Sequence, residues 1–389
     1  MRNILWISVL ATALFLPQSC GKLEIGPSST CSYTPGAAHP KAAAYQAVLD
    51  KYTAKGLPGI SALIRDDQGV WVGVAGWADL DARIPMRPCT VSKGASTTKT
   101  FVAVLTLLLE EEGKLSLNDP IEKWLPEEVV EKVKNVRGST IRRLLDHTTG
   151  IADVIEDNDF YLAVLNDPPH KWTPDELIKF VYHDDPLFPV GTDVEYSNTN
   201  FLLLAMILNK VTGGDHSAAL RARVLEPLGL SDTWYYPHDN LPAETAQGYF
   251  DLYNNGTILN LTNYNTGSGN GYGGIYSTVF DLQTFIEALV REKRVLKPET
   301  LDKMFSFVPD EGYNRENGLG IFRDFLERAP DQFAYGHRGR DLGYTADMFW
   351  FPNQDYTMTY LINYGTDAKS DLRPVFLDFR KEIVDVMME

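Results

Sequence analysis

Extended apolar runs lie near both ends of this 389-residue chain, and the stretch between them, from about 96 to 295, has mostly helical spacing. The runs near the start, 60–65 and 70–76, flank Asp66-Asp67-Gln68-Gly69, whose Asp and Gly suit the turn of a β-hairpin. Two runs near the end, at 347–351 and 357–363, precede a terminal helix at about 371–387. This order predicts one sheet assembled from both ends of the chain, with an all-helical subdomain inserted into it.

The same pattern sets the expected boundaries. We expect a folded domain over residues 39–365 that begins with a helix at 40–55. After this domain, residues 366–389 form a C-terminal helix that packs on the sheet. The cleft between the sheet and the inserted part is the natural place for a functional site. The sheet part is expected at about 39–90 and 296–389, and the helical part at about 91–295.

The first residues have the pattern of an export signal. Residues 1–20 combine an early Arg2, an apolar stretch and a terminal cysteine, which predicts a signal peptide of the lipoprotein type. In that case Cys20 carries a lipid that tethers the protein to the cell envelope, and 21–38 form a flexible tether. Plain secretion into the periplasm is the alternative. The remaining cysteines, Cys31 and Cys89, either form a disulfide or stay two separate thiols.

The charge balance excludes several partners. The formal net charge is -16, with no basic run, whereas binding to nucleic acid or to an anionic membrane surface needs clustered Lys and Arg. The seven histidines form no HExxH pattern, and no Cys/His cluster has the spacing of metal ligands. We therefore expect no nucleic acid, no metal and no cofactor.

A serine and a lysine stand at the start of a strongly apolar helix. The run from Phe101 to Leu109 is apolar on nearly every face, so its helix must be buried. Ser96 and Lys99 are three residues apart and share one face of its first turn. A serine hydroxyl needs a neighbouring base, and lysine can be that base once burial lowers its pKa. The plain alternative makes Ser96 a helix cap and Lys99 a solvated residue.

Two further segments carry polar groups beside buried elements. Tyr196 and Asn198 lie in a loop that enters a second apolar helix, 201–208, where the phenol can carry a proton and the amide can bind a substrate. The alternative is a polar residue that only caps this helix. His337-Arg338-Gly339 stands just before an extended run, where a glycine permits close approach of a substrate and backbone N–H groups can bind an oxyanion.

Taken in this order, the three segments resemble the motifs of the serine β-lactamase and penicillin-binding protein superfamily, in particular its class C-like branch of D,D-peptidases, class C β-lactamases, D-aminopeptidases and esterases. The resemblance runs from about 45 to 365. It implies an α/β (α+β) fold of the β-lactamase/transpeptidase type, with an antiparallel sheet flanked by helices and an inserted all-helical subdomain. Its flanking matches lie at 111–120, 140–151, 227–230, 273–278 and 335–344.

The resemblance also implies roles for the matching residues. Ser96 would attack a carbonyl and form an acyl-enzyme, and Lys99 and Tyr196 would move protons; which of these two is the general base stays open. Backbone N–H groups of Ser96 and Arg340 would form the oxyanion hole. The implied substrate-binding residues are Asn198, His337, Gly339 and Arg340.

Departures from the family pattern bear on the substrate. His337 stands where class C β-lactamases usually have lysine, and Arg338 replaces a small residue, so that it could narrow the cleft or offer a cation to a substrate carboxylate. We expect a D-alanyl-D-alanine carboxypeptidase-like peptidase acting on a small or peptide substrate, such as a peptidoglycan fragment. The alternatives are a short-acyl esterase, a β-lactamase, and a non-catalytic protein that binds peptides or peptidoglycan.

Two other patterns are not expected to carry chemistry. The segment 269–274 fits GxGxxG, but it neither follows a strand nor opens a βαβ unit, so we expect no dinucleotide there. His147 is expected to be a satisfied, buried histidine rather than a catalytic base.

Overall fold

The computed structural model of the protein describes residues 39–389. The predicted signal peptide, tether and lipidated Cys20 lie outside the described residues, as does Cys31. Cys89 is disulfide-bonded, and its pairing with Cys31 stays a prediction. Within 39–389, no helix has the length and apolar character needed to cross a bilayer, and no group of three or more His, Cys, Asp or Glu side chains is placed to hold a metal ion.

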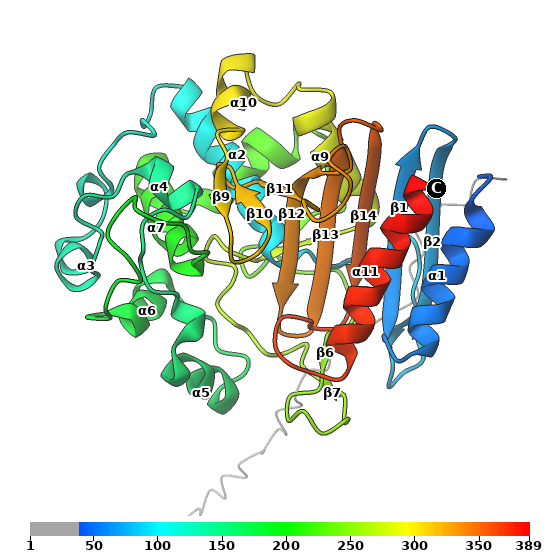
Figure 1. The fold of residues 1–389 in the computed structure, drawn as a ribbon. Helices are drawn as coiled ribbons and strands as arrows, with labels where there is room; N and C mark the ends of the chain where they lie inside the picture. The colour runs from blue at the N-terminus through cyan, green and yellow to red at the C-terminus, as the bar shows by residue number, and fades with distance from the viewer. Residues whose placement is uncertain (1–38) are drawn as a thin grey trace, which may run out of the picture.

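An antiparallel sheet of nine strands forms the centre of the described part of the chain, in the order β3-β2-β1-β14-β13-β12-β11-β10-β9 (Figure 1). The two ends of the chain meet in it, because β1 pairs with β14, with Ala62 opposite Tyr360. The predicted fold class is confirmed. The strands are β1 (Gly59–Asp66), β2 (Gly69–Asp79), β3 (Ile84–Pro85), β9 (Val308–Asp310), β10 (Arg315–Asn317), β11 (Phe322–Asp324), β12 (Ala334–Asp341), β13 (Tyr344–Phe351) and β14 (Tyr356–Ile362).

The strands β1 and β2 form the hairpin that the sequence predicts. Gly69 has a φ of +132°, in the region that favours glycine, and it pairs with Asp66 across the turn. Nearly every residue of β1 is buried, since helices cover both faces of the sheet. A buried strand of this kind reads as a continuous apolar run, which explains why it is visible in the sequence.

Two helices from opposite ends of the chain cover one face of the sheet. These are α1 (Ala42–Ala54) and α11 (Leu372–Met388), which lie side by side across the strands in Figure 1. Their buried aromatic residues meet the sheet in one core, where the Phe379 ring lies 5.7 Å from Tyr52 and 5.2 Å from Tyr360. The sheet is thus closed on this side by the two terminal helices.

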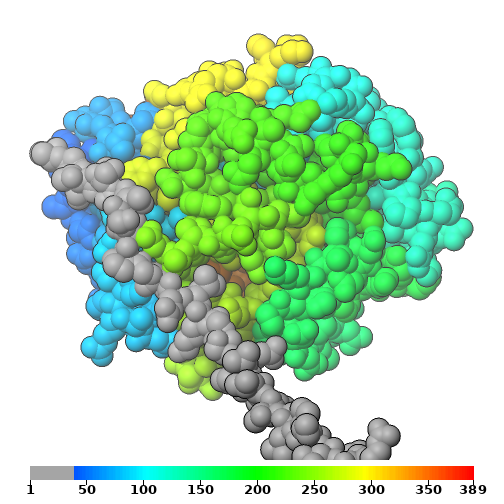
Figure 2. Space-filling model, turned by 180° about the vertical axis from the view of Figure 1, so that it is seen from behind, coloured from blue at the N-terminus to red at the C-terminus, as the bar shows by residue number. Residues whose placement is uncertain are grey.

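The other face is covered by α2 (Thr98–Glu111), α9 (Val279–Ile286) and the inserted part. The Phe101 and Phe285 rings stack between α2 and α9, with centroids 3.6 Å apart. Figure 2 shows that green and yellow segments cover most of this side, with a recess in which orange atoms of the C-terminal part are visible. The other helices are α3 (Glu127–Lys132), α4 (Ile141–Leu145), α5 (Asn158–Asn166), α6 (Pro174–Leu177), α7 (Asn198–Thr212), α8 (His216–Leu220) and α10 (Pro298–Met304).

The inserted part also contains short strands, which the sequence analysis did not expect. β4, β8 and β5 form a three-stranded sheet, and β6 pairs with β7. Strands of two or three residues are too short to show a period of two, so no sequence pattern announces them. Their bounds are β4 (Ser92–Lys93), β5 (Trp234–Tyr235), β6 (Tyr249–Phe250), β7 (Leu259–Asn260) and β8 (Ile275–Ser277).

Candidate active site

Ser96 and Lys99 stand at the junction between a short 3-10 helix, Ala95–Thr97, and α2. The buried Ala95, just before the serine, has a φ of +49°, so the chain turns sharply there. Ser96 stays partly exposed, whereas Lys99 is 0% exposed because α2 is buried on nearly every side. One turn of the chain therefore pairs an accessible hydroxyl with a buried amine.

The Lys99 amine has three hydrogen-bond partners. Its Nζ donates to the Ser96 Oγ at 3.1 Å, to the Asn198 Oδ1 at 2.7 Å and to the Tyr272 carbonyl oxygen at 2.8 Å. Burial lowers the pKa of Lys99 to about 7, although the charges of Asp153 and Asp341 act in the other direction. Lys99 can therefore lose its proton near neutral pH while two fixed acceptors hold it in place.

The Tyr196 ring lies beside this amine. The Lys99 Nζ is 4.8 Å from the ring centroid, and the partly exposed Tyr196 side chain shares a hydrogen bond with that of Ser96. Burial raises the pKa of Tyr196 well above its usual range, while the Ser96 hydrogen bond and the charge of Arg315 act against this rise. The phenol is therefore protonated in the resting site and able to donate a proton.

Asn198 is the first residue of α7, and its amide connects two groups of the site. Its Oδ1 accepts from Lys99, and its Nδ2 donates to the Asp153 Oδ2 at 2.9 Å. Burial raises the pKa of Asp153 to about 6, against the hydrogen bonds from Asn198 and Ile155. Both ends of the Asn198 amide are thus engaged within the protein.

The third motif, His337-Arg338-Gly339, lies inside strand β12. The sequence analysis expected it just before an extended run. Strand β11 pairs with β12 only as far as Gly336, so the backbone from His337 to Asp341 has one edge free of it. A Cβ on Gly339 would lie 2.0 Å from the carbonyl oxygen of Gly94, two residues before Ser96. This close approach brings the free edge of β12 to the nucleophile, where a strand edge can offer N–H groups to an oxyanion.

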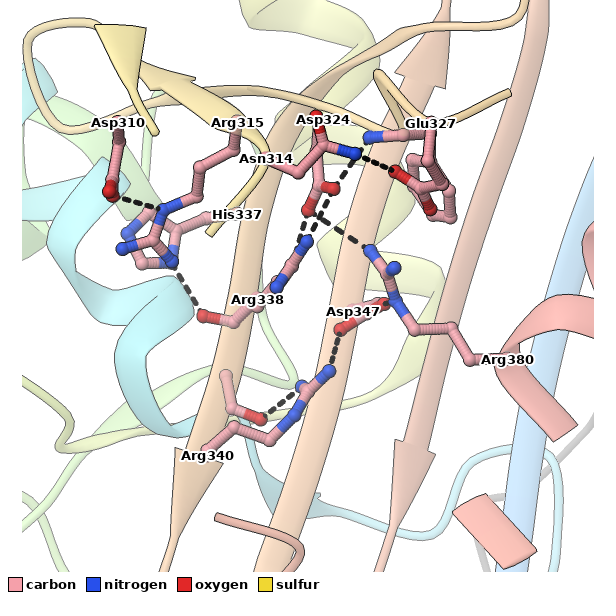
Figure 3. A network of polar contacts seen from close by, with 12 residues as sticks. Asp310, Asn314, Arg315, Asp324, Glu327, His337, Arg338, Arg340, Asp347 and Arg380 are labelled. Carbon is pink, nitrogen blue, oxygen red and sulfur yellow. Dashed lines mark hydrogen bonds and ion pairs between the residues drawn. The ribbon is translucent and has the colours of Figure 1, made fainter. Parts of the chain in front are cut away.

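The side chains of β12 do not all serve the site. His337 stacks on Phe322, with centroids 4.0 Å apart, and lies 6.2 Å from Tyr196. The expectation that Arg338 narrows the cleft or binds a substrate carboxylate is wrong: its guanidinium binds both oxygens of the buried Asp324 (Figure 3). Side chains alternate along a strand, so Arg338 and Arg340 leave β12 on the face opposite His337 and Gly339.

Behind β12, three arginines and two fully buried carboxylates form a network (Figure 3). Arg380 of α11 donates to the Asp347 Oδ2 at 2.7 Å and to the Asp324 Oδ2 at 3.0 Å. Arg340 forms an ion pair with the Asp347 Oδ1 at 2.8 Å and donates to the carbonyl oxygens of Gly339 and Ala346, each at 2.6 Å. The network therefore ties α11 to the backbone of the strand that carries the third motif.

Sequence reasoning missed several residues that shape the site. The glycine-rich segment that we set aside as a false nucleotide motif supplies the Tyr272 carbonyl to Lys99; a Cβ on Gly271 would lie 2.3 Å from the Phe201 carbonyl oxygen of α7. Asp153 holds Asn198, and Arg315 lies against Tyr196. Of these features, only the glycines of 269–274 could have been noticed in the sequence, because a run of glycines marks a place where two backbone segments approach closely.

His147 supports the loop that carries Tyr196. Its Nδ1 accepts from the Ser197 backbone N–H and contacts the Asn200 amide nitrogen, each at 3.2 Å, and its ring lies 4.5 Å from Tyr196. Burial lowers the pKa of His147 well below its usual range, so the imidazole is neutral. Its Nε2 has no hydrogen-bond partner among the described residues, so only one of its two ring nitrogens is satisfied.

Replacing Gly339 with alanine is expected to lower kcat about 100-fold, because the clash with Gly94 displaces β12 from Ser96 by an ångström or more. The free energy of unfolding should fall by about 1–3 kcal/mol, the usual cost of overpacking. Steady-state kinetics and denaturant unfolding check both values. Gly214→Ala, where a Cβ meets nothing within 4 Å, is the matched control, and equal kcat values for the two variants would contradict the close approach.

The fold is that of the β-lactamase/transpeptidase proteins, and the site sets the Ser96 hydroxyl beside the buried Lys99 amine. The Beta-lactamase family model matches residues 45–377, and the chain belongs to that family. A D-stereospecific amidohydrolase from Streptomyces sp. is 30% identical, with a TM-score of 0.76, over 87% of this chain and 98% of that one. The D-amino acid amidase from Ochrobactrum anthropi SV3 is 26% identical, with a TM-score of 0.76, over 89% of this chain and 98% of that one.

Curated relatives are penicillin-binding proteins and related chains. A penicillin-binding protein of Bacillus subtilis (strain 168) is 28% identical over 308 residues, which are 76% of this chain and 65% of the relative. Protein flp of Staphylococcus aureus (strain MRSA252) is 30% identical over 194 residues, 50% of this chain and 38% of the relative. This chain therefore spans less than two thirds of the length of these relatives.

Proposed function

We propose that this protein is a serine amidohydrolase that cleaves the amide bond after a D-amino acid, by way of an acyl-enzyme on Ser96. The observation that carries this proposal is the setting of Lys99. Its buried amine has two fixed acceptors, the Asn198 Oδ1 and the Tyr272 carbonyl oxygen, and Ser96 as its third neighbour. When the amine is neutral, its two N–H groups remain on those acceptors and its lone pair faces Ser96, ready to take the hydroxyl proton.

The proposed steps balance over the residues of the site. Ser96 attacks the substrate carbonyl as its proton passes to Lys99, and the free edge of β12 stabilises the oxyanion. Tyr196 donates its proton to the leaving nitrogen and then takes from Lys99 the proton that Ser96 gave up. Water then attacks the acyl-serine, and the same groups return the proton to Ser96 as the acid leaves.

The choice of a D-amino acid rests on similarity to two solved structures, those of a D-stereospecific amidohydrolase and a D-amino acid amidase. The penicillin-binding relatives favour a second candidate, the D-alanyl-D-alanine carboxypeptidase that the sequence analysis expected. Both candidates share the same acyl half, a D-aminoacyl group on Ser96, and differ in the leaving group.

The test is incubation of purified protein with a D-alanyl-D-alanine peptide, D-phenylalanine amide, the L-enantiomer of each, a p-nitrophenyl ester and a fluorescent penicillin. We expect hydrolysis of at least one D-substrate, weak reaction with its L-enantiomer, and an adduct on the peptide that contains Ser96 by mass spectrometry. Ser96→Ala serves as the blank. Turnover of the ester alone would replace this proposal with an esterase, and rapid penicillin turnover would replace it with a β-lactamase.

The pH dependence of the reaction should follow Lys99. Because burial lowers its pKa to about 7, the amine is charged below pH 7 and neutral above it. The value of kcat/KM should therefore rise about tenfold per pH unit between pH 5 and 6.5, and become level above pH 8. A pH–rate profile with wild-type protein checks this, and a profile that falls between pH 6 and 8 would contradict a neutral Lys99 as the base.

A further inference from the structure

A chain of hydrogen bonds joins the glycine-rich segment 269–274 to α7. Two of its members, Tyr235 on β5 and His216 at the start of α8, are 1% and 2% exposed. The Tyr235 Oη accepts from the Gly271 backbone N–H at 3.0 Å and contacts the His216 Nε2 at 2.9 Å. The His216 Nδ1 lies 2.8 Å from the Oδ1 of Asn209, near the end of α7. The proposed reaction uses none of these side chains.

The direction of each bond in this chain is fixed. Burial lowers the pKa of His216 to about 4, and the charge of His238 adds to this against that of Asp215, so the imidazole is neutral with one proton. The Asn209 Oδ1 also accepts the His216 backbone N–H at 2.8 Å, and an oxygen of this kind only accepts, so the ring proton is on Nδ1. The Nε2 must then accept from the Tyr235 hydroxyl. Every donor of the chain therefore meets an acceptor.

The chain connects the two parts of the molecule that hold the Lys99 amine. One fixed acceptor of this amine, Asn198, is the first residue of α7. The other is the carbonyl of Tyr272, which directly follows Gly271. The hydrogen bond from Gly271 to Tyr235 thus holds the backbone one residue away from the carbonyl that accepts from Lys99.

We propose that Tyr235 and His216 are positioning residues, which keep the Tyr272 carbonyl aimed at the catalytic amine. The inference rests on the proposed function, in which Lys99 takes the proton of Ser96. With the carbonyl in place, both N–H groups of the neutral amine are occupied and its lone pair faces the hydroxyl. With the carbonyl displaced, the amine can rotate, and a misplacement of about 1 Å can cost up to about 100-fold in rate.

Removal of the Tyr235 hydroxyl should therefore act on Lys99 and not only on folding. The buried Gly271 N–H would lose its acceptor, and the peptide beside Tyr272 would turn to recover one. A carbonyl oxygen accepts more strongly from an ammonium than from a neutral amine, so its departure disfavours the charged form and lowers the pKa of Lys99 below about 7. A tyrosine that only filled space would leave this pKa unchanged.

The experiment compares Tyr235→Phe with Tyr45→Phe. The control also removes a buried hydroxyl, one that donates to the Asp66 Oδ2 at 2.8 Å in the core between α1 and the sheet. In Tyr235→Phe the segment should stay folded, because the His238 Nε2 still donates to the Gly269 carbonyl oxygen at 3.1 Å.

Two quantities are measured for both variants. On the best D-substrate, kcat should fall about tenfold in Tyr235→Phe while KM stays within about twofold, because the substrate contacts are unchanged. NMR titration of protein with lysine labelled with 13C at Cε should show the Lys99 midpoint lowered by about half a pH unit or more. Lys99→Met identifies the signal. Tyr45→Phe should change neither quantity.

A Lys99 midpoint that is equal in Tyr235→Phe and wild type overturns the proposal, even if the variant is slower or less stable, because a structural role alone explains such losses. If Tyr235→Phe does not fold, His216→Leu, which removes the acceptor of the hydroxyl, decides by the same midpoint. If wild type turns over none of the substrates, the proposed function fails by itself. The titration needs no turnover, so a lowered midpoint still supports the positioning role and an unchanged one still overturns it.

Discussion

Replacing Ser96 with alanine or Lys99 with methionine is expected to lower kcat by a factor on the order of ten thousand to a million, and the double variant should be no worse than either. The reason is that the two side chains act as one unit. Without the amine the hydroxyl keeps its proton, and without the hydroxyl the amine has nothing to activate. The measurement is steady-state kcat on the best D-substrate, with Ser116→Ala and Lys114→Met, beyond the far end of α2, as controls.

The two variants should differ in stability even though they match in activity. Methionine at position 99 removes the donor of two buried acceptors, the Asn198 Oδ1 and the Tyr272 carbonyl oxygen. Each unsatisfied acceptor costs about 1–3 kcal/mol, partly offset because the charged amine no longer has to be buried. Ser96→Ala removes only a partly exposed hydroxyl and should unfold like wild type. If the Lys99→Met variant keeps a tenth of the wild-type kcat, Ser96 and Lys99 do not act as one catalytic unit.

Much of the central sheet could be predicted from the sequence because its long strands are buried apolar runs. The β1–β2 hairpin, β13, β14 and both terminal helices follow from periodicity and turn residues. The edge strands β9, β10 and β11 have three residues each and show no period. The sequence therefore predicted the middle of the sheet and left out the edge that carries Arg315.

The sequence predicts those parts of the candidate site in which a recognisable side chain does the chemistry. It does not predict the parts that depend on a backbone group or on a charge from a distant segment. Ser96, Lys99, Tyr196 and Asn198 are recognisable by residue type and order. The Tyr272 carbonyl is not, because every residue has one. Arg338 was misread because the motif was expected just before a strand; alternation inside β12 puts its side chain on the far face.

Replacing Arg380 with methionine is expected to lower the free energy of unfolding at pH 7 by about 3 kcal/mol. The change leaves two carboxylates, each 0% exposed, with one fewer cation. The cost stays near the lower end for a broken buried pair because Asp324 keeps Arg338 and Asp347 keeps Arg340. Denaturant unfolding measures it, and Arg373→Met, at an exposed position in the first turn of the same helix, should change the value by no more than about 0.5 kcal/mol.

The penalty of Arg380→Met should shrink as the pH falls, which separates a charge effect from lost packing. Burial alone would raise the pKa of Asp324, but the charges of Arg380 and Arg338 hold this pKa well below its usual range. Burial acts in the same way on Asp347, and the charges of Arg340 and Arg380 lower its pKa. A lowered carboxyl pKa contributes stability above the unfolded-state pKa of about 3.9 and loses it as the pH falls toward the folded-state value. Without Arg380 the folded-state pKa values rise, so the variant loses less than wild type between pH 5 and 3. A penalty that stays constant over this range would mean that Arg380 acts by packing on the Phe325 ring, 3.9 Å away, and not by its charge.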